Sequence, residues 1–131
     1  MNYSLNTIIL EPLTKGKAKN AVILCHGYGG DGKDISILAS YWRAHLPETI
    51  FICPDAPEKC VASPTGFQWF DLTDQTPEQI LSKSLVAENK LNKLIDEVKD
   101  KNNLLANQIV IGGFSQGCMI SLQTGIKRKD T

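Results

Sequence analysis

Hydrophobic residues gather into short runs that polar segments separate. The run Ala21–Cys25 is apolar at every position, Thr49–Cys53 and Ile109–Ile111 are similar, and Ile8–Leu10 is a shorter candidate. Solidly apolar runs of this length are typical of strands covered on both faces. The chain is therefore expected to contain a buried, mostly parallel sheet.

Between these runs the apolar spacing changes to a helical one. The first predicted helix begins with Asp34 as its N-cap and ends at Pro47. A second begins at Thr76–Pro77, because proline favours the first helical position, and a third covers 115–126. Strands that alternate with helices predict an α/β fold with helices on both faces of the sheet.

One long segment, 58–76, has no periodic pattern and is expected to be irregular. Loops of this length inside a compact domain are commonly functional or disordered. The aromatic residues Phe67, Trp69 and Phe70 argue against disorder. The segment is therefore a candidate part of a binding site.

Composition narrows the class of protein without identifying it. The 131 residues suffice for one modest domain, and their net charge of zero gives no global field for nucleic acid or an anionic membrane. No apolar run approaches the ~20 residues that span a bilayer, and the N-terminus lacks the features of a secretory signal. The four cysteines form no C-x-x-C pair and no histidine lies at metal-ligand spacing, so free thiols in a reducing cytoplasm and no metal are expected.

The sequence "QIVIGGFSQGCM" carries the most specific chemical signal. Within it, "GFSQG" fits the pattern G-x-S-x-G between a predicted strand and a predicted helix. Such a turn forces the central Ser115 into strained backbone geometry, and the flanking positions need glycine because a side chain there would meet neighbouring backbone. Ser115 would then stand as a nucleophile at a helix N-terminus, where the backbone N–H of Gln116 favours a developing oxyanion. The alternative is a plain turn with Ser115 as an ordinary N-cap.

A second oxyanion donor is expected from the loop after an earlier strand. The sequence "CHGYGG" lies there, and the backbone N–H of Tyr28 is the candidate. A glycine-rich loop alone could also bind phosphate or merely turn. However, "HGYGGDGK" lacks the Gly-Lys-Ser/Thr order of a P-loop, since Asp34 follows Lys33, and it lacks the dinucleotide spacing.

Together these residues resemble the acyl-protein thioesterase and carboxylesterase/lysophospholipase family of α/β-hydrolases. The matching segments are "VILCHGYGGDG", "ICPDAP", "WFD" and "IVIGGFSQGCMISL". The resemblance implies hydrolysis of small-molecule, lipid or acyl-protein esters by a Ser-Asp-His triad without a cofactor. It assigns the nucleophile to Ser115 and the oxyanion amides to Tyr28 and Gln116. It also implies that the loop through Trp69 and Phe70 helps to line the acyl site, although simple packing of these aromatics is an equal alternative.

Two of the three triad members are missing from this chain. The superfamily places an acid and then a histidine after the serine, whereas only Asp130 follows Ser115, and no histidine does. Asp130 lies just past the serine helix, so it is not nominated as the triad acid. His45 is expected near the end of the first helix, as a surface or capping residue. His26 is the better-placed substitute base, but the resemblance implies a structural role for it.

The sequence therefore predicts the N-terminal portion of a single α/β-hydrolase domain, 1–131, whose later strands are missing and which alone lacks a complete triad. The alternative is a non-catalytic remnant or interaction module that keeps the fold only. In either case the strand Ile109–Ile111 is expected to pair with Ala21–Cys25 on one side and to leave its other side open. An open apolar edge predicts self-association or marginal stability.

Overall fold

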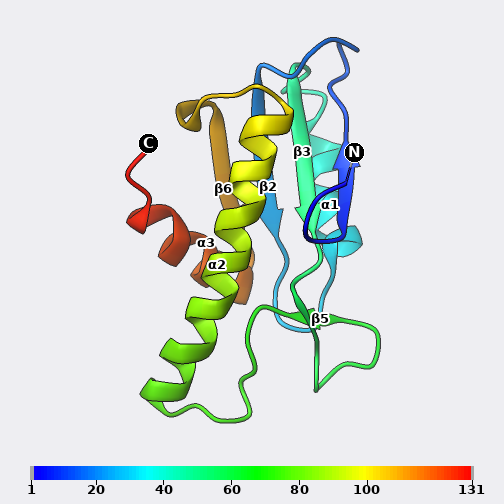
Figure 1. Cartoon of the computed structure of the whole chain (residues 1–131). Coiled ribbons are helices and arrows are strands. Elements are labelled where there is room, and N and C mark those ends of the chain that lie inside the picture. Colours follow the sequence, from blue (N-terminus) through cyan, green and yellow to red (C-terminus); the bar gives the residue numbers. More distant parts are fainter. Residues whose placement is uncertain (1, 131) are drawn as a thin grey trace.

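The sheet of this protein is mixed, with parallel strands at its centre. A computed structural model describes residues 2–130, in which four strands form a sheet of order β1-β3-β2-β6 (Figure 1). Strands β2 (Asn20–Cys25), β3 (Thr49–Pro54) and β6 (Ile109–Gly113) are parallel, and β1 (Thr7–Leu10) runs antiparallel to β3. The predicted α/β class and its mostly parallel sheet are confirmed.

Helices cover both faces of the sheet. Helix α1 (Gly32–Trp42) packs on one face, while α2 (Pro77–Lys101) and α3 (Gln116–Lys127) pack on the other (Figure 1). All six residues of β3 are buried, which explains why its sequence is almost entirely apolar. Within residues 2–130, no helix is both long enough and apolar enough to cross a bilayer.

The core has one part on each face of the sheet. The larger part lies under α2 and α3, where the apolar stripe of α2 is buried: Leu91, Leu94, Ile95 and Val98. Ile35 and Ala39 of α1 pack on the other face. Two core thiols belong to strands, and burial raises the pKa of Cys25 and of Cys53 to about 12. All four cysteines are free, as predicted.

The boundaries of α1 differ from the prediction at both ends. Its N-cap is Asp31, not Asp34, because the Asp31 carboxylate accepts a hydrogen bond from the Asp34 N–H at 2.7 Å. The helix ends at Trp42, before Pro47, and the chain turns through a hydrogen bond from His45 N–H to the Trp42 carbonyl. Pro47 disfavours helical geometry only at Leu46, so the helix ends four residues before the position that the proline restricts.

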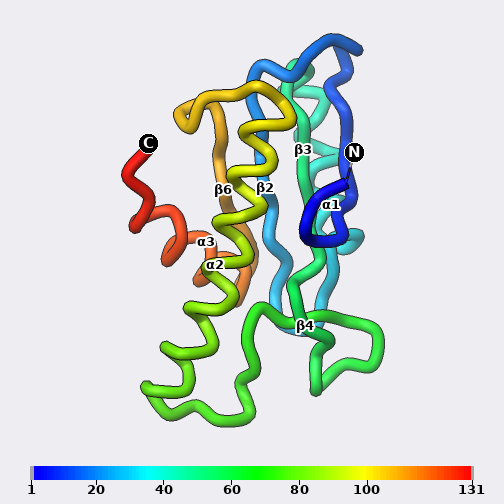
Figure 2. Tube along the Cα trace, in the orientation of Figure 1, coloured from blue at the N-terminus to red at the C-terminus, as the bar shows by residue number. Residues whose placement is uncertain are grey.

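The segment 58–76 is more ordered than predicted. It contains a short hairpin of β4 (Glu58–Lys59) and β5 (Phe67–Gln68), which lies at the end of the sheet beyond the carboxyl ends of β2 and β3 (Figure 2). The hairpin is joined to the loop after β2, because Gly29 N–H donates to the Phe67 carbonyl at 2.9 Å. A short 3₁₀ helix, Ala106–Gln108, precedes β6.

Strand β6 pairs with β2 on one side, as predicted, with Ile23 opposite Ile111. In the described part of the chain its other side has no partner strand. Phe114 N–H donates to the Cys25 carbonyl, so the alternation of a strand directs the backbone groups of Ile111 and Gly113 toward the open side, whereas the Ile109 N–H donates to the Ala106 carbonyl. The predicted open edge is therefore present.

Candidate active site

Three loops meet at one edge of the sheet because β2, β3 and β6 are parallel and end there. The loop after β2 carries His26 and Tyr28, the loop after β3 carries Asp55, and β6 runs into Ser115. In α/β proteins this edge is where ligands bind. The fold thus brings together both glycine-rich segments that the sequence singled out.

Ser115 occupies a strained turn between β6 and α3. Its backbone angles are φ 54° and ψ −117°, a region that residues with a side chain rarely adopt. The side chain is exposed, and its hydroxyl makes no capping hydrogen bond to α3. An ordinary N-cap has extended backbone and a capping oxygen, so that interpretation is disfavoured. The predicted strained turn is confirmed, whereas the nucleophilic role of Ser115 stays a prediction.

The glycines on either side of Ser115 allow close backbone contact. A Cβ atom on Gly113 would lie 2.5 Å from the Cys25 carbonyl oxygen, and one on Gly117 would overlap the same oxygen. Gly112, by contrast, faces open space. The pattern G-x-S-x-G therefore reflects a steric requirement at both outer positions, as predicted.

Of the two predicted oxyanion residues, Gln116 follows Ser115 directly and Tyr28 follows a residue that packs against Ser115. A Cβ atom on Gly27, which precedes Tyr28, would be 3.4 Å from the Ser115 Cβ, so the loop after β2 packs against the turn. Within residues 2–130, the Tyr28 N–H has no backbone or side-chain acceptor. Gln116 is the first residue of α3, whose N–H has no acceptor within the helix. Both amides are thus available near Ser115, and their role as oxyanion donors stays a prediction.

His26 is a buried structural residue. Its Nδ1 lies 2.7 Å from the Gly27 carbonyl oxygen, and its Nε2 accepts from Ala56 N–H at 2.9 Å. These partners assign the proton to Nδ1 and leave neither nitrogen free to take a proton from Ser115. The side chain is 2% exposed. The structure therefore disfavours His26 as the general base and favours the structural role.

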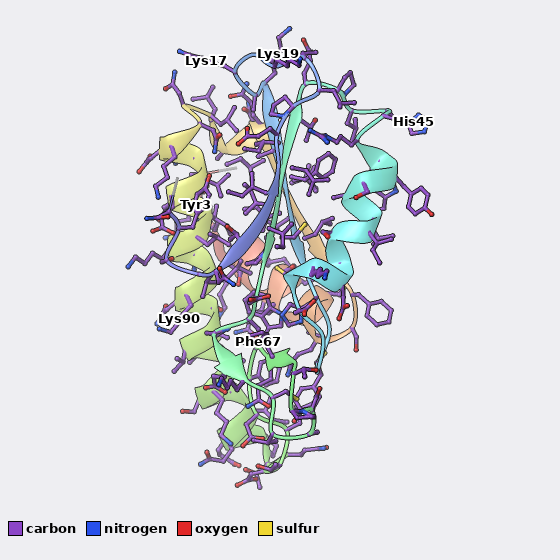
Figure 3. All side chains as sticks on the ribbon, turned by 90° about the vertical axis from the view of Figure 1, so that its right-hand side faces the viewer. Tyr3, Lys17, Lys19, His45, Phe67 and Lys90 are labelled. Carbon is purple, nitrogen blue, oxygen red and sulfur yellow. The ribbon has the colours of Figure 1, made fainter. Side chains whose placement is uncertain are left out.

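The remaining titratable candidates lie away from Ser115. His45 is exposed just beyond α1, at the end of the molecule opposite Phe67 and the loop after β2 (Figure 3). Asp130 lies beyond the C-terminal end of α3, a helix about 18 Å long. Hydrogen bonds from Arg128 and Lys99 hold the pKa of Asp130 far below its usual range. Neither residue is placed to complete a triad.

Trp69 and Phe70 are core residues of this structure, with exposures of 1% and 3%. The indole N–H of Trp69 donates to the His26 carbonyl at 2.9 Å. This burial supports the packing alternative for both aromatics. A contact with substrate stays a prediction.

The side chain of Gln116 is a feature that sequence reasoning missed. It is 2% exposed, its Oε1 accepts from Trp69 N–H at 2.8 Å, and its Nε2 donates to the Phe70 carbonyl at 2.8 Å. Only its backbone N–H had been assigned a role. No local signal could have found this role, because both partners lie 46 and 47 residues away in the sequence.

Two carboxylates cap the N-terminus of α1 and argue against phosphate binding there. Asp55 accepts from the Gly32 N–H at 2.8 Å, and Asp31 accepts from the Asp34 N–H. The N–H groups that would hold a phosphate are thus occupied by acidic side chains. The nucleotide-binding alternative is disfavoured.

An exposed serine on a strained strand-to-helix turn, at the carboxyl edge of a mostly parallel sheet, is the arrangement typical of α/β-hydrolase folds. The family model described as Phospholipase/Carboxylesterase matches residues 9–130, and the chain belongs to that family.

Named relatives agree with this assignment. Acyl-protein thioesterase 1 of Schizosaccharomyces pombe is 31% identical over 131 aligned residues, which cover 96% of this chain and 57% of the relative. Acyl-protein thioesterase 1 of Yarrowia lipolytica is 38% identical over 112 residues, which cover 79% of this chain and 49% of the relative. The crystal structure of esterase PE8 is similar with a TM-score of 0.87 and 34% identity over 95% of this chain and 58% of that one. The chain spans about half the length of the curated relatives it matches.

Proposed function

We propose that the chain is the N-terminal portion of a single α/β-hydrolase domain that cleaves acyl esters or thioesters through Ser115. The observation that carries this proposal is the strained, exposed position of Ser115 between β6 and α3. The backbone amides of Tyr28 and Gln116 bind the oxyanion, and the reaction needs no cofactor. Removing one oxyanion donor typically lowers the catalytic rate ~100- to 1,000-fold, so the rate depends strongly on where these two amides lie.

The substrates are small-molecule, lipid or acyl-protein esters, because the named relatives are thioesterases and esterases. Trp69 and Phe70 support the acyl site from the loop 69–71. The four free cysteines fit a cytoplasmic location, where thiols remain reduced.

This chain alone is expected to lack a general base. Both ring nitrogens of His26 are engaged, and His45 lies at the other end of the molecule. A serine hydroxyl without a base is a poor nucleophile. Full activity therefore requires an acid and a histidine from outside these residues, and the chain alone retains only the residual reactivity that its oxyanion amides provide.

Covalent labelling with a fluorophosphonate tests the proposal. Incubation at neutral pH, with intact mass and peptide mapping as readouts, is expected to give slow modification confined to Ser115. Added imidazole should accelerate it, because a free base substitutes for the missing histidine. The matched control is Ser115→Ala, which removes the hydroxyl but keeps the turn. Labelling that is spread over other serines, or no more rapid at Ser115 than in the unfolded chain, would overturn the proposal.

A second candidate function is a non-catalytic interaction module, which is favoured because no histidine among residues 2–130 is free near Ser115 and because the edge of β6 is open. On this proposal two copies associate through their β6 strands. Val110 of β6 and the adjoining Phe114 are 61% and 68% exposed, and within residues 2–130 β6 has no partner strand on its outer side. Sedimentation should show concentration-dependent dimers that Val110→Lys weakens. A monomer at all concentrations would refute this candidate.

A further inference from the structure

A buried hydrogen-bonded network joins the serine turn to the loop that carries Tyr28. Its members are the side chains of His26, Trp69 and Gln116, which are only 1% to 2% exposed. They come from the loop after β2, the loop before α2 and the start of α3. Segments that are far apart in the sequence are therefore joined by polar groups without access to water.

Gln116 makes the first link. Its side-chain amide accepts from the Trp69 N–H and donates to the Phe70 carbonyl, both at 2.8 Å. An amide is suited to this position because it offers an acceptor and a donor side by side. These two bonds fix the loop 69–70 to the first residue of α3, directly beside Ser115.

Trp69 and His26 make the second link. The Trp69 indole N–H donates to the His26 carbonyl at 2.9 Å, and the two rings lie with centroids 5.8 Å apart. The His26 ring in turn bonds the Gly27 carbonyl and the Ala56 N–H. The backbone of residues 26–27, which leads directly to the Tyr28 amide, is therefore held from both sides.

The hairpin supports the same loop from outside. Gly29 N–H donates to the Phe67 carbonyl at 2.9 Å, and Phe67 N–H donates to the Gly30 carbonyl at 2.8 Å. Phe67 is two residues before Trp69, so a shift of residues 69–70 would move these bonds as well. The position of the Tyr28 amide thus depends on the segment that Gln116 holds.

We propose that the side chain of Gln116 is a positioning group, which fixes the Tyr28 amide relative to Ser115 through Trp69 and His26. Gln116 then serves the oxyanion site twice, once with its own backbone N–H and once by setting the distance to the second donor. This inference rests on the proposed function of Ser115. It adds a role for a side chain that does not touch the reacting atoms.

Two variants and a control separate positioning from general stability. Gln116→Met keeps the length but removes both hydrogen-bonding groups, and Gln116→Glu keeps an oxygen acceptor for Trp69 while it loses the donor to Phe70. The control is Ile120→Val on the same helix, which is 1% exposed and belongs to the core. All proteins are compared under conditions where circular dichroism shows them to be folded.

Amide hydrogen exchange and Ser115 labelling are the two readouts. In Gln116→Met the amides of Gly29 and Gly30 should exchange at least ~10-fold faster relative to amides of β3, because their local opening becomes easier. Fluorophosphonate labelling of Ser115 should fall ~10- to 100-fold, as expected for a displaced oxyanion donor. Gln116→Glu should be at least as disruptive as Gln116→Met, because it buries a carboxylate against the Phe70 carbonyl, and Ile120→Val should match the wild type in both readouts.

The outcomes are distinguishable from those of the proposed function. If Gln116→Met leaves the exchange of Gly29 and Gly30 at the level of Ile120→Val, the positioning role is wrong, whatever Ser115 does. If exchange accelerates but labelling of Ser115 is unchanged, the link to the oxyanion site is wrong. If exchange accelerates and the wild-type Ser115 cannot be labelled, the proposed function fails while the mechanical coupling stands.

Discussion

Replacing Ser115 by glycine should stabilise the folded chain, although Ser115 is the residue on which the proposed activity depends. The backbone of Ser115 is held at φ 54° and ψ −117°, where a non-glycine residue costs ~1–3 kcal/mol. Glycine adopts this region without strain but loses about 0.5–1 kcal/mol more backbone entropy on folding. The net expectation is a gain of about 1 kcal/mol in the free energy of unfolding, or ~3–4 °C in Tm for a chain of this size.

The assay is urea unfolding of Ser115→Gly beside Ser115→Ala as the matched control. Alanine keeps the strain, and the serine hydroxyl makes no capping hydrogen bond that alanine could lose, so Ser115→Ala should lie within about 0.5 kcal/mol of the wild type. Ser115→Gly should therefore be the more stable of the two variants. If Ser115→Gly is instead less stable than Ser115→Ala, the turn is not strained and the reasoning from its backbone angles is refuted.

Three further predictions concern the surroundings of the turn. Gly113→Ala should lower the free energy of unfolding by at least ~2 kcal/mol, because the new Cβ would lie 2.5 Å from a backbone oxygen. The control Gly112→Ala places its Cβ in open space and should change the free energy of unfolding little. Equal effects of the two variants in urea unfolding would contradict this prediction. Native alkylation with iodoacetamide should modify Cys118 first, because the other three thiols are buried, and mass mapping that finds a different cysteine first would contradict it. Burial alone would raise the pKa of Glu88, but hydrogen bonds from its partners, chiefly Lys127, lower this pKa overall. The ionised Glu88 therefore stabilises the fold above pH 4.5, and this stabilisation is lost as the pH falls. Glu88→Gln should reduce the loss of unfolding free energy at acid pH, and an unchanged loss would refute the prediction.

Much of the fold could be predicted because the relevant signals are local. The run Thr49–Cys53 is apolar since β3 is buried on both faces, and Pro77 marks the start of α2 through its fixed backbone angle. The strained turn at Ser115 was predictable for a similar reason, because glycine at positions 113 and 117 indicates close backbone contacts on both sides of the serine.

The errors concern contacts that are made across the chain. Asp31 and Asp34 both suit a helix start, and only the geometry of the loop after β2 decides that Asp31 is the N-cap. The hairpin within 58–76 depends on hydrogen bonds to Gly29 and Gly30, and the local sequence does not predict these bonds. The partners of the Gln116 side chain lie 46 and 47 residues away, so its buried role could not be read from its neighbours in sequence.

The amide spectrum of the chain after phosphonylation of Ser115 shows whether an oxyanion site faces this residue. The phosphonyl oxygen is expected to accept hydrogen bonds from the backbone amides of Tyr28 and Gln116. Their ¹⁵N–¹H resonances should therefore shift strongly downfield, while the Phe114 amide, which precedes Ser115 and already donates to the Cys25 carbonyl, should shift little. A label on Ser115 that leaves both amides unmoved, or a label that avoids Ser115, would contradict this expectation.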